Sequence, residues 1–238
     1  MANLTQLKRL EDLDGFLLVD KPAGIGFSTV VKTVKRKFNL VKVGHGGSLD
    51  AMASGLLVLL INDANKFVDG VMGADRAYTG TIRLGLRTNT HDIYGEEVGG
   101  AGPVPEAGEL ESRMSGVIRD FTGDVFQTES RWCSIRREGS ASYEIADTGE
   151  HGRQLVHVYG FDVKPDLSFS VKGTRGLLVK TLVNDFGDAL GCGVALASLR
   201  RTEVGKFKVE DAIPFAKILE TEMRDFESMV MPLSAALK

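Results

Sequence analysis

The chain has 238 residues, of which 43% are hydrophobic and 26% are charged, and its formal net charge is −3 at neutral pH. This size and composition predict a globular protein with one large domain, or one domain with a small appendage. The longest apolar run covers only residues 56–61, and residues 1–15 have the features of neither a secretory signal nor a transit peptide. We therefore expect a cytoplasmic protein that has no contact with a membrane.

The first half of the chain predicts a strand at 16–19, which a Lys-Pro pair and a glycine turn end. A helix is expected from Ser28, its N-cap, to Phe38. Its apolar face would hold Val30, Val31, Val34 and Phe38, and its basic face would hold Lys32, Lys35 and Arg36. A buried segment at 56–61, a helix over 63–72 and a strand over 78–84 follow.

In the second half, a surface loop rich in glycine, proline and glutamate covers residues 95–108. The next helix places Leu110, Met114, Val117, Ile118 and Phe121 on one face. Strands within 145–162 and at 169–171, a helix over 179–190 and a strand over 194–199 complete the chain order. No repeat and no long linker is present, so the expected class is α+β around a mixed sheet.

The two cysteines, Cys133 and Cys192, lie far apart in the sequence and have no CxxC or Cys/His spacing around them. This spacing indicates neither a disulfide framework nor a zinc site. We expect both to be small buried side chains, and we expect no metal.

Basic residues gather in one stretch although the whole chain is acidic, with a sequence pI of about 5.9. No acidic residue lies between Lys21 and Leu49, and this stretch leads directly to Asp50. Its basic residues are Lys21, Lys32, Lys35, Arg36, Lys37 and Lys42. On charge alone, a surface for nucleic-acid phosphates and a solvated helix face explain the stretch equally well.

The segment GHGGSLDAMASG, residues 44–55, surrounds one aspartate with small side chains. A phosphate-binding P-loop needs a Lys-Ser/Thr pair and a dinucleotide site needs G-x-G-x-x-G, and neither pattern is present. His45, Ser48 and Asp50 are too close in one short loop to form a hydrolase triad. Two interpretations remain: Asp50 caps a following turn, or the glycines allow a close approach to Asp50 as the reactive group.

Residues 44–67 resemble the catalytic motif of the TruB family of pseudouridine synthases, whose usual form is GH-G-LDP-A-TGLL followed by an apolar strand. The family's aspartate falls on Asp50. Further family motifs match in order and at consistent spacing, at 15–24, 76–96, 127–149, 174–207 and 230–237. The resemblance implies a pseudouridine synthase fold, with a mixed, mostly antiparallel central sheet flanked by helices and loops.

The resemblance also implies the activity of a tRNA pseudouridine(55) synthase. The C1′–N1 bond of the T-loop uridine would break and a C1′–C5 bond would form, with Asp50 as the catalytic carboxylate and no cofactor or metal. Asp50 is either a nucleophile or a base at the sugar, because both roles use an ionised carboxylate. The implied partner is the T-arm of tRNA, and the implied state is a monomer.

Roles for other residues follow from the same resemblance. Tyr78 would stack on the uracil and relay the C5 proton, although a strand tyrosine that faces the core is the alternative. His45 would fill the space that the flipped base leaves. Lys180 stands where the family has an arginine that pairs with Asp50 and Asp92. The remaining predicted substrate-binding residues are Gly46, Leu178, Leu199 and Arg201.

Residues 127–149 match a family segment that forms a thumb over the RNA. The family's Pro-Pro pair is Glu129-Ser130 here, and its tyrosine is Trp132. Basic and aromatic side chains together grip unstacked bases. The predicted RNA-binding residues are therefore Lys21, Lys35, Arg36, Arg131, Trp132 and Arg136.

The sequence ends soon after the last motif, so we expect a catalytic domain at 1–213 and a short helical extension at 214–238 in place of a C-terminal PUA domain. The departure at Lys180 keeps an alternative function open, a tRNA-binding or tRNA-folding factor of the same family with impaired or lost catalysis. A small-molecule enzyme that binds phosphate on the glycine loop is a third interpretation.

Overall fold

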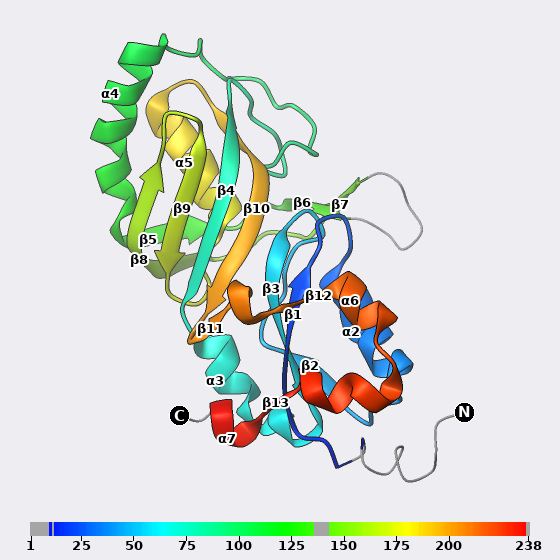
Figure 1. Cartoon of the computed structure of the whole chain (residues 1–238). Coiled ribbons are helices and arrows are strands. Elements are labelled where there is room, and N and C mark those ends of the chain that lie inside the picture. The colour runs from blue at the N-terminus through cyan, green and yellow to red at the C-terminus, as the bar shows by residue number, and fades with distance from the viewer. Residues whose placement is uncertain (1–9, 11, 136–142, 237–238) are drawn as a thin grey trace. The chain divides into compact units, whose positions relative to one another are not determined.

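The computed structural model describes residues 10, 12–135 and 143–236 (Figure 1). The chain divides into two compact units, Met1–Ala74 with Arg201–Lys238, and Asp75–Arg200. Each unit combines helices with a sheet, so the predicted α+β class is confirmed.

The sheet of the first unit is built on two long neighbours, β1 (Gly15–Lys21) and β3 (Ser54–Ile61), which pair antiparallel with Val19 opposite Leu57. β2 (Val43–His45) pairs with the other edge of β3. Two short strands near the C-terminus extend β1, with β12 (Ile213–Pro214) parallel and β13 (Met231–Pro232) antiparallel to it. The sheet is therefore mixed, and the predicted extension at 214–238 contributes to it.

β1 and β3 are buried on both faces, which explains their continuous apolar sequence. Alternate side chains point to opposite sides of a strand. Leu17 and Leu57 pack on one face with Val30 and Phe38, whereas Leu18 and Leu56 face the opposite cluster.

Helices cover both faces of this sheet (Figure 1). On one face lie α2 (Phe27–Lys37) and α6 (Phe215–Glu220), and on the other lies α3 (Val68–Gly73). Shorter turns complete the unit: η1 (Asn62–Phe67), η3 (Val209–Asp211), η4 (Met223–Met229) and α7 (Leu233–Ala236). The predicted helix at 63–72 is thus a 3-10 turn followed by an α-helix.

The basic helix α2 has the predicted faces, with Val30, Val34 and Phe38 buried and Lys32, Lys35 and Arg36 exposed. Its predicted start is wrong. Gly26 is the N-cap, with φ −70° and ψ 145°, and Ser28 lies inside the first turn. A glycine supplies the extended backbone that a cap requires without a side-chain acceptor, so the preference for serine misplaces the boundary.

The second unit has a sheet in the order β10-β4-β9-β8-β5. The strands are β4 (Arg76–Leu84), β5 (Gly123–Thr128), β8 (Arg153–Val163), β9 (Ser168–Gly173) and β10 (Val194–Val204), whose end continues into the first unit. There β11 (Phe207–Lys208) pairs with it antiparallel. β4 and β9, β9 and β8, and β8 and β5 are also antiparallel. The predicted, mostly antiparallel pairing is confirmed.

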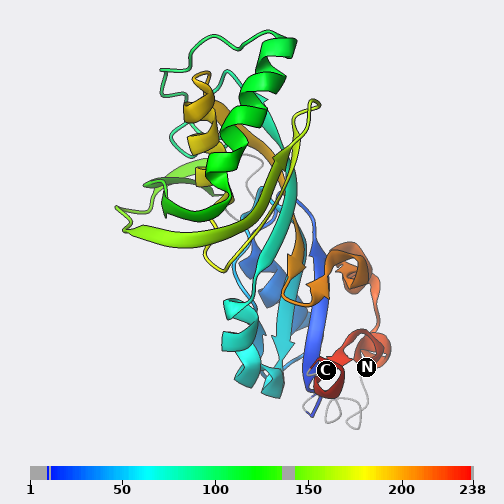
Figure 2. The same cartoon turned by 90° about the vertical axis from the view of Figure 1, so that its left-hand side faces the viewer.

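Two helices lie on one side of this second sheet, α4 (Ala107–Val117), which continues as η2 (Ile118–Phe121), and α5 (Val179–Leu190) (Figure 2). Phe121 and Phe186 meet edge to face, with ring centroids 5.9 Å apart, and both contact Phe161. α5 has its predicted bounds and ends at Gly191, whose φ of 79° suits glycine.

A separate hairpin of β6 (Trp132–Ile135) and β7 (Glu144–Asp147) lies between β5 and β8 in the chain. Neither cysteine forms a disulfide; Cys192 is buried as predicted, whereas Cys133 is only half-buried. In the described ranges, no helix is both long and apolar enough to cross a membrane. The cytoplasmic location stays a prediction.

Candidate functional site

The Asp50 loop, residues 44–55, connects β2 to β3 in the first unit, and two of its glycines lie against neighbouring side chains. A Cβ atom on Gly44 would overlap Asn65 Oδ1, and one on Gly46 would overlap Val71 Cγ1. The Gly46 amide donates to the Val58 carbonyl over 2.8 Å. These glycines therefore allow the loop to lie directly on the fold, and the predicted close approach to Asp50 stays a prediction.

Arg201 fixes the backbone of this loop by hydrogen bonds. Its guanidinium donates from Nε to the Leu56 carbonyl (2.8 Å), from Nη1 to Ser48 (2.8 Å) and from Nη2 to Gly47 (3.2 Å). The side chain is 1% exposed. A planar fork that is fixed at three carbonyls makes Arg201 a positioning residue for the loop. The predicted substrate contact of Arg201 gains no support from a side chain so deeply buried.

Lys21 holds the same loop from β1. Its ammonium donates to the carbonyls of Pro22 (2.9 Å), Ile25 (2.8 Å) and Ala51 (3.5 Å). The Ala51 carbonyl also accepts from the Gly24 amide over 2.7 Å. The side chain is completely buried. A phosphate cannot reach this ammonium, so the geometry argues against the predicted RNA contact of Lys21.

Burial also changes the acidity of Lys21. It lowers the pKa from the ordinary 10.5 to about 8, because the charged ammonium loses its hydration. The negative charge of Asp50 partly opposes this shift and the positive charge of Arg201 adds to it. The negative charge of Asp50 therefore stabilises the charged form of Lys21.

Asp50 itself is exposed, and its carbonyl accepts from the Ala53 amide over 3.1 Å. The loop around it is tied to the fold at its backbone by two buried cations. Its side chain is therefore exposed while the backbone of its loop is fixed. Such an arrangement suits a reactive carboxylate, because preorganisation lowers the cost of reaching the reactive geometry.

His45 precedes the loop glycines and is half-buried beside Phe27, with ring centroids 4.8 Å apart. Its Nδ1 accepts a hydrogen bond from the Gly47 amide over 3.3 Å. Burial and the nearby Arg201 charge lower the pKa of His45, and the neutral ring is favoured. An accepting Nδ1 places the proton on Nε2.

In the second unit, the structure brings together Lys180 and Asp92, as the sequence predicts. Lys180 Nζ lies 2.8 Å from Asp92 Oδ2, and the Asp92 side chain is completely buried. The other oxygen, Oδ1, accepts from Thr90 Oγ1 (2.9 Å) and from the Tyr94 amide (2.9 Å). Both carboxylate oxygens are hydrogen-bonded, so Asp92 is held rigidly.

The turn that carries Asp92 is fixed on β10 by backbone hydrogen bonds to Leu196. The Leu196 amide donates to the His91 carbonyl and the Ile93 amide donates to the Leu196 carbonyl, each over 3.0 Å. His91 has a φ of 61°, an uncommon value for a residue with a side chain. This turn therefore aims Asp92 at Lys180 at the cost of an unusual backbone conformation.

The predicted base-binding residues belong to strands and a helix start of the second unit. Tyr78 lies on β4 opposite Val171 of β9 and is 7% exposed, and Leu199 on β10 is 8% exposed. Leu178 is half-buried and is the N-cap of α5. A buried Tyr78 agrees with a core role and with the wall of a narrow site, so its role stays a prediction.

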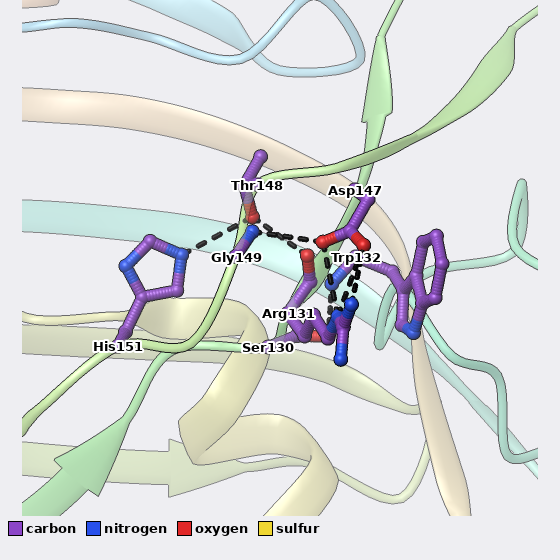
Figure 3. A network of polar contacts seen from close by, with 7 residues as sticks. All are labelled: Ser130, Arg131, Trp132, Asp147, Thr148, Gly149 and His151. Carbon is purple, nitrogen blue, oxygen red and sulfur yellow. Dashed lines mark hydrogen bonds and ion pairs between the residues drawn. The ribbon is translucent and has the colours of Figure 1, made fainter.

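The thumb segment, residues 127–149, contains a polar network that the sequence did not reveal (Figure 3). Arg131 forms a fork on Asp147, with Nε 3.0 Å from both oxygens and Nη2 2.7 Å from Oδ2. The Gly149 amide also donates to Asp147, and Thr148 Oγ1 donates to the Arg131 carbonyl. The network closes the open end of the β6–β7 hairpin.

Arg131 also lies over the ring of Trp132, with its guanidinium carbon 5.5 Å from the ring centroid, and Trp132 is 38% exposed. Lys35 and Arg36 are exposed on α2, where a phosphate can reach them. The predicted contact of Arg136 lies outside the described residues. Within the described part of the chain, no three His, Cys, Asp or Glu side chains gather as a metal site.

The sequence also did not reveal the structural role of Gln127. Its amide Nε2 donates to the Leu178 carbonyl over 3.1 Å and its Oε1 accepts from the Leu178 amide over 2.9 Å. Gln127 is 1% exposed. Gln127 is the first residue of the matched family segment at 127–149, but the motif does not reveal this pairing, because the partner of Gln127 is a backbone.

Comparisons with known proteins agree with these motifs. Residues 35–170 match the model of the TruB family pseudouridylate synthase (N terminal domain). Residues 180–238 match that of the tRNA pseudouridylate synthase B C-terminal domain. The predicted boundary at 213 stays a prediction.

Two curated relatives are both named tRNA pseudouridine synthase B. The protein of Opitutus terrae is 36% identical over 233 residues, which cover 95% of this chain and 95% of that protein. The protein of Burkholderia pseudomallei strain 668 is 33% identical, with 94% of this chain and 76% of that protein covered.

A solved structure shares the fold. A chain in the crystal structure of the archaeal box H/ACA sRNP Nop10-Cbf5 complex matches with a TM-score of 0.69 and 24% identity. The match covers 97% of this chain and 63% of that chain, so the present chain spans less than two thirds of that relative. The likeness extends the agreement from the sequence motifs to the fold.

Proposed function

Because the chain belongs to the TruB family of pseudouridylate synthases, we propose that it converts a uridine of tRNA to pseudouridine. The observation that carries the proposal is the exposed Asp50 carboxylate on a loop fixed by Arg201 and Lys21. Its relatives of 36% and 33% identity are named for this activity. The substrate uridine is that of the T-loop, position 55, and the partner surface is the T-arm.

The reaction is an isomerisation in which the C1′–N1 bond breaks, the base turns, and C5 bonds to C1′. A carboxylate near C1′ stabilises the positive charge that develops on the sugar, as in glycoside hydrolysis. Asp50 does this either as a nucleophile that bonds C1′ or as a base at the sugar. C5 loses its proton when it bonds C1′ and N1, released from C1′, gains one, so the isomerisation neither consumes nor releases a net proton and needs no cofactor or metal.

The base leaves its stack before it reacts. We assign Tyr78 to stack on the uracil and to relay the C5 proton, Leu178 and Leu199 to the apolar wall, and His45 with Gly46 to the space that the base leaves. A neutral His45 ring suits that space, because it adds no charge beside the RNA backbone. We assign Lys180 as the cation that pairs with Asp50 during the reaction, while it also pairs with Asp92.

RNA contact is assigned to the exposed basic residues of α2 and to the thumb. Lys35 and Arg36 meet phosphates, and Trp132 with Arg131 meets unpaired bases. Lys21 is not included, since its ammonium is buried. We propose that the protein acts as a monomer.

One observation favours a second candidate, a tRNA-binding or tRNA-folding factor that has lost efficient catalysis. Lys180 contacts Asp92 Oδ2 through its ammonium Nζ at 2.8 Å, whereas an arginine at this position has a planar fork that can bridge two carboxylates. The second candidate has the same RNA surface but forms pseudouridine slowly or not at all.

The experiment that separates the candidates incubates the protein with unmodified tRNA transcript and detects pseudouridine at each base. The enzyme is expected to modify one T-loop uridine in the wild-type protein and none with Asp50→Asn, which keeps the size of the side chain but removes its charge. The affinity of the variant for tRNA should stay within about threefold, because one exposed side chain changes. Conversion by Asp50→Asn would remove the assignment, and no conversion by the wild type would favour the binding factor.

A further inference from the structure

We propose that Gln127 is a positioning residue for Lys180, which it serves by fixing the N-terminus of α5 to the root of the thumb. The inference rests on the proposed function, in which Lys180 acts beside Asp50. Gln127 lies at the point where β5 ends and the thumb segment begins, and both of its amide atoms are used inside the protein.

The first step is the reciprocal pair between Gln127 and Leu178. Leu178 is the N-cap of α5, and its carbonyl also accepts the first helical hydrogen bond, from the Leu182 amide over 2.9 Å. The N-terminal amides of a helix need partners from outside it. A buried glutamine satisfies the amide and carbonyl of the cap residue together, so it fixes where α5 begins.

The second step concerns the residues on either side of Lys180. Thr181 Oγ1 donates to the Thr128 carbonyl over 3.3 Å, one residue after Gln127 on β5. The contacts at Leu178 and Thr181 therefore bracket Lys180 in the first turn of the helix. Lys180 reaches Asp92 from a backbone that the end of β5 holds on both sides.

The third step links Asp92 to the same thumb segment. Ser130 Oγ donates to the Asn89 carbonyl over 2.6 Å. The ring of Tyr143 stacks on Tyr94, with centroids 3.9 Å apart, and the Tyr94 amide is a donor to Asp92. The thumb thus contacts the elements that carry both partners of the ion pair.

A substitution at Gln127 should therefore affect the chemical step, through Lys180, and RNA binding differently. Loss of the Gln127 amide leaves the part-buried Leu178 N–H without its acceptor, which is unfavourable, and removes one of the two donors to the Leu178 carbonyl, which keeps the Leu182 amide. α5 then relieves that cost by shifting or fraying at Leu178, and Lys180 moves with it. Because Gln127 does not touch the substrate in this scheme, the chemical step should suffer more than RNA affinity.

The test uses Gln127→Met in the full chain, with Gln154→Met as its matched control. Gln154 is the cross-strand partner of Gln127, and its amide makes one hydrogen bond, to the Gly176 carbonyl before the helix. We expect Gln127→Met to lower the single-turnover rate by at least about tenfold, with tRNA affinity within about threefold, and the control to stay near wild type. A rate like that of wild type would overturn the proposal.

A double-mutant cycle with Lys180→Ala separates positioning from general destabilisation. If Gln127 acts through Lys180, Gln127→Met has no further effect on the rate once Lys180 is absent. If the rate loss of the double variant equals the product of the two single losses, the residues act independently and the proposal is wrong.

A measurement without catalysis keeps this inference distinct from the proposed function. The exchange of the Lys180 ammonium protons with solvent can be followed by NMR with labelled lysine. We expect Gln127→Met, but not Gln154→Met, to accelerate this exchange by about tenfold, because the contact with Asp92 loosens. If the wild type is inactive, the proposed function fails, and unchanged exchange alone overturns the role of Gln127.

Discussion

Lys180 Nζ lies 2.8 Å from Oδ2 of Asp92, whose side chain is completely buried, whereas that of Lys180 is 17% exposed. The lysine is therefore not a solvated residue of its helix. It supplies the positive charge beside a carboxylate that water cannot reach, and Thr90 and Tyr94 satisfy the other oxygen. A buried charge is tolerated when it is both paired and hydrogen-bonded in this way.

Lys180 should therefore be needed for stability as well as for the reaction. Lys180→Ala leaves Asp92 without its cation, and breaking a buried pair costs about 3–5 kcal/mol. We expect a loss of this size in the free energy of unfolding and strongly slowed single-turnover chemistry. Urea denaturation and rapid-quench assays measure the two effects.

Lys180→Arg is the informative companion. In the proposed reaction residue 180 serves Asp50 as well as Asp92, and a guanidinium fork suits two carboxylates, so this variant should convert tRNA faster than wild type with little change in affinity. Equal rates for the wild type, Lys180→Arg and Lys180→Ala would exclude Lys180 from the reaction.

The fold and the site differ in how much of each the sequence predicts. Alternating apolar residues and a terminal glycine predict β4 and α5 well, because local sequence determines both the pattern and the stop. The position of Asp50 follows from its motif. The supports of the loop do not follow, because Arg201 and Lys21 bind backbone carbonyls, which every residue possesses. Their burial becomes visible only when distant segments come together.

The basic face of α2 gives a prediction about RNA binding. Lys35→Glu combined with Arg36→Glu should weaken tRNA binding and reduce the salt dependence of the affinity. With fewer phosphate contacts, binding releases fewer counterions from the RNA. Affinity measured across a series of salt concentrations tests both effects.

The matched control reverses two exposed lysines elsewhere in the first unit, Lys206→Glu with Lys208→Glu, and alters the net charge equally. If both pairs weaken binding to the same extent, overall charge is responsible and α2 is not an RNA surface. An unchanged affinity with the α2 pair would identify a solvated helix face.

The lowered pKa of Lys21 predicts a specific pH dependence of stability. Below pH 8 the lysine is protonated in both the folded and the unfolded chain, so it contributes no slope. Between pH 8 and 10.5 the folded protein releases this proton while the unfolded chain keeps it, and stability rises with pH. The gain should approach roughly 3 kcal/mol.

The gain is measured as the difference in unfolding free energy between the wild type and Lys21→Met at several pH values. The unfolding free energy of the wild type minus that of Lys21→Met should increase as the pH rises above 8. Lys208→Met removes an exposed lysine and should follow the wild-type profile. Parallel profiles for the wild type and Lys21→Met would mean that the folded protein does not depress this pKa.

Arg201→Lys tests whether the fixed loop serves the reaction. A lysine keeps the positive charge but has one ammonium for the three carbonyls of Gly47, Ser48 and Leu56, so the loop that carries Asp50 should loosen. A displacement of about 1 Å at a reacting group can cost about 10²-fold in rate, and we expect a loss of this order in single turnover.

Affinity for tRNA should change little, because the side chain is buried beneath the loop. The adjacent Arg200→Lys, which makes the same exchange at a half-buried position, is the control. If Arg201→Lys weakens tRNA binding and leaves the bound rate intact, Arg201 contacts RNA directly and the loop does not depend on its fork.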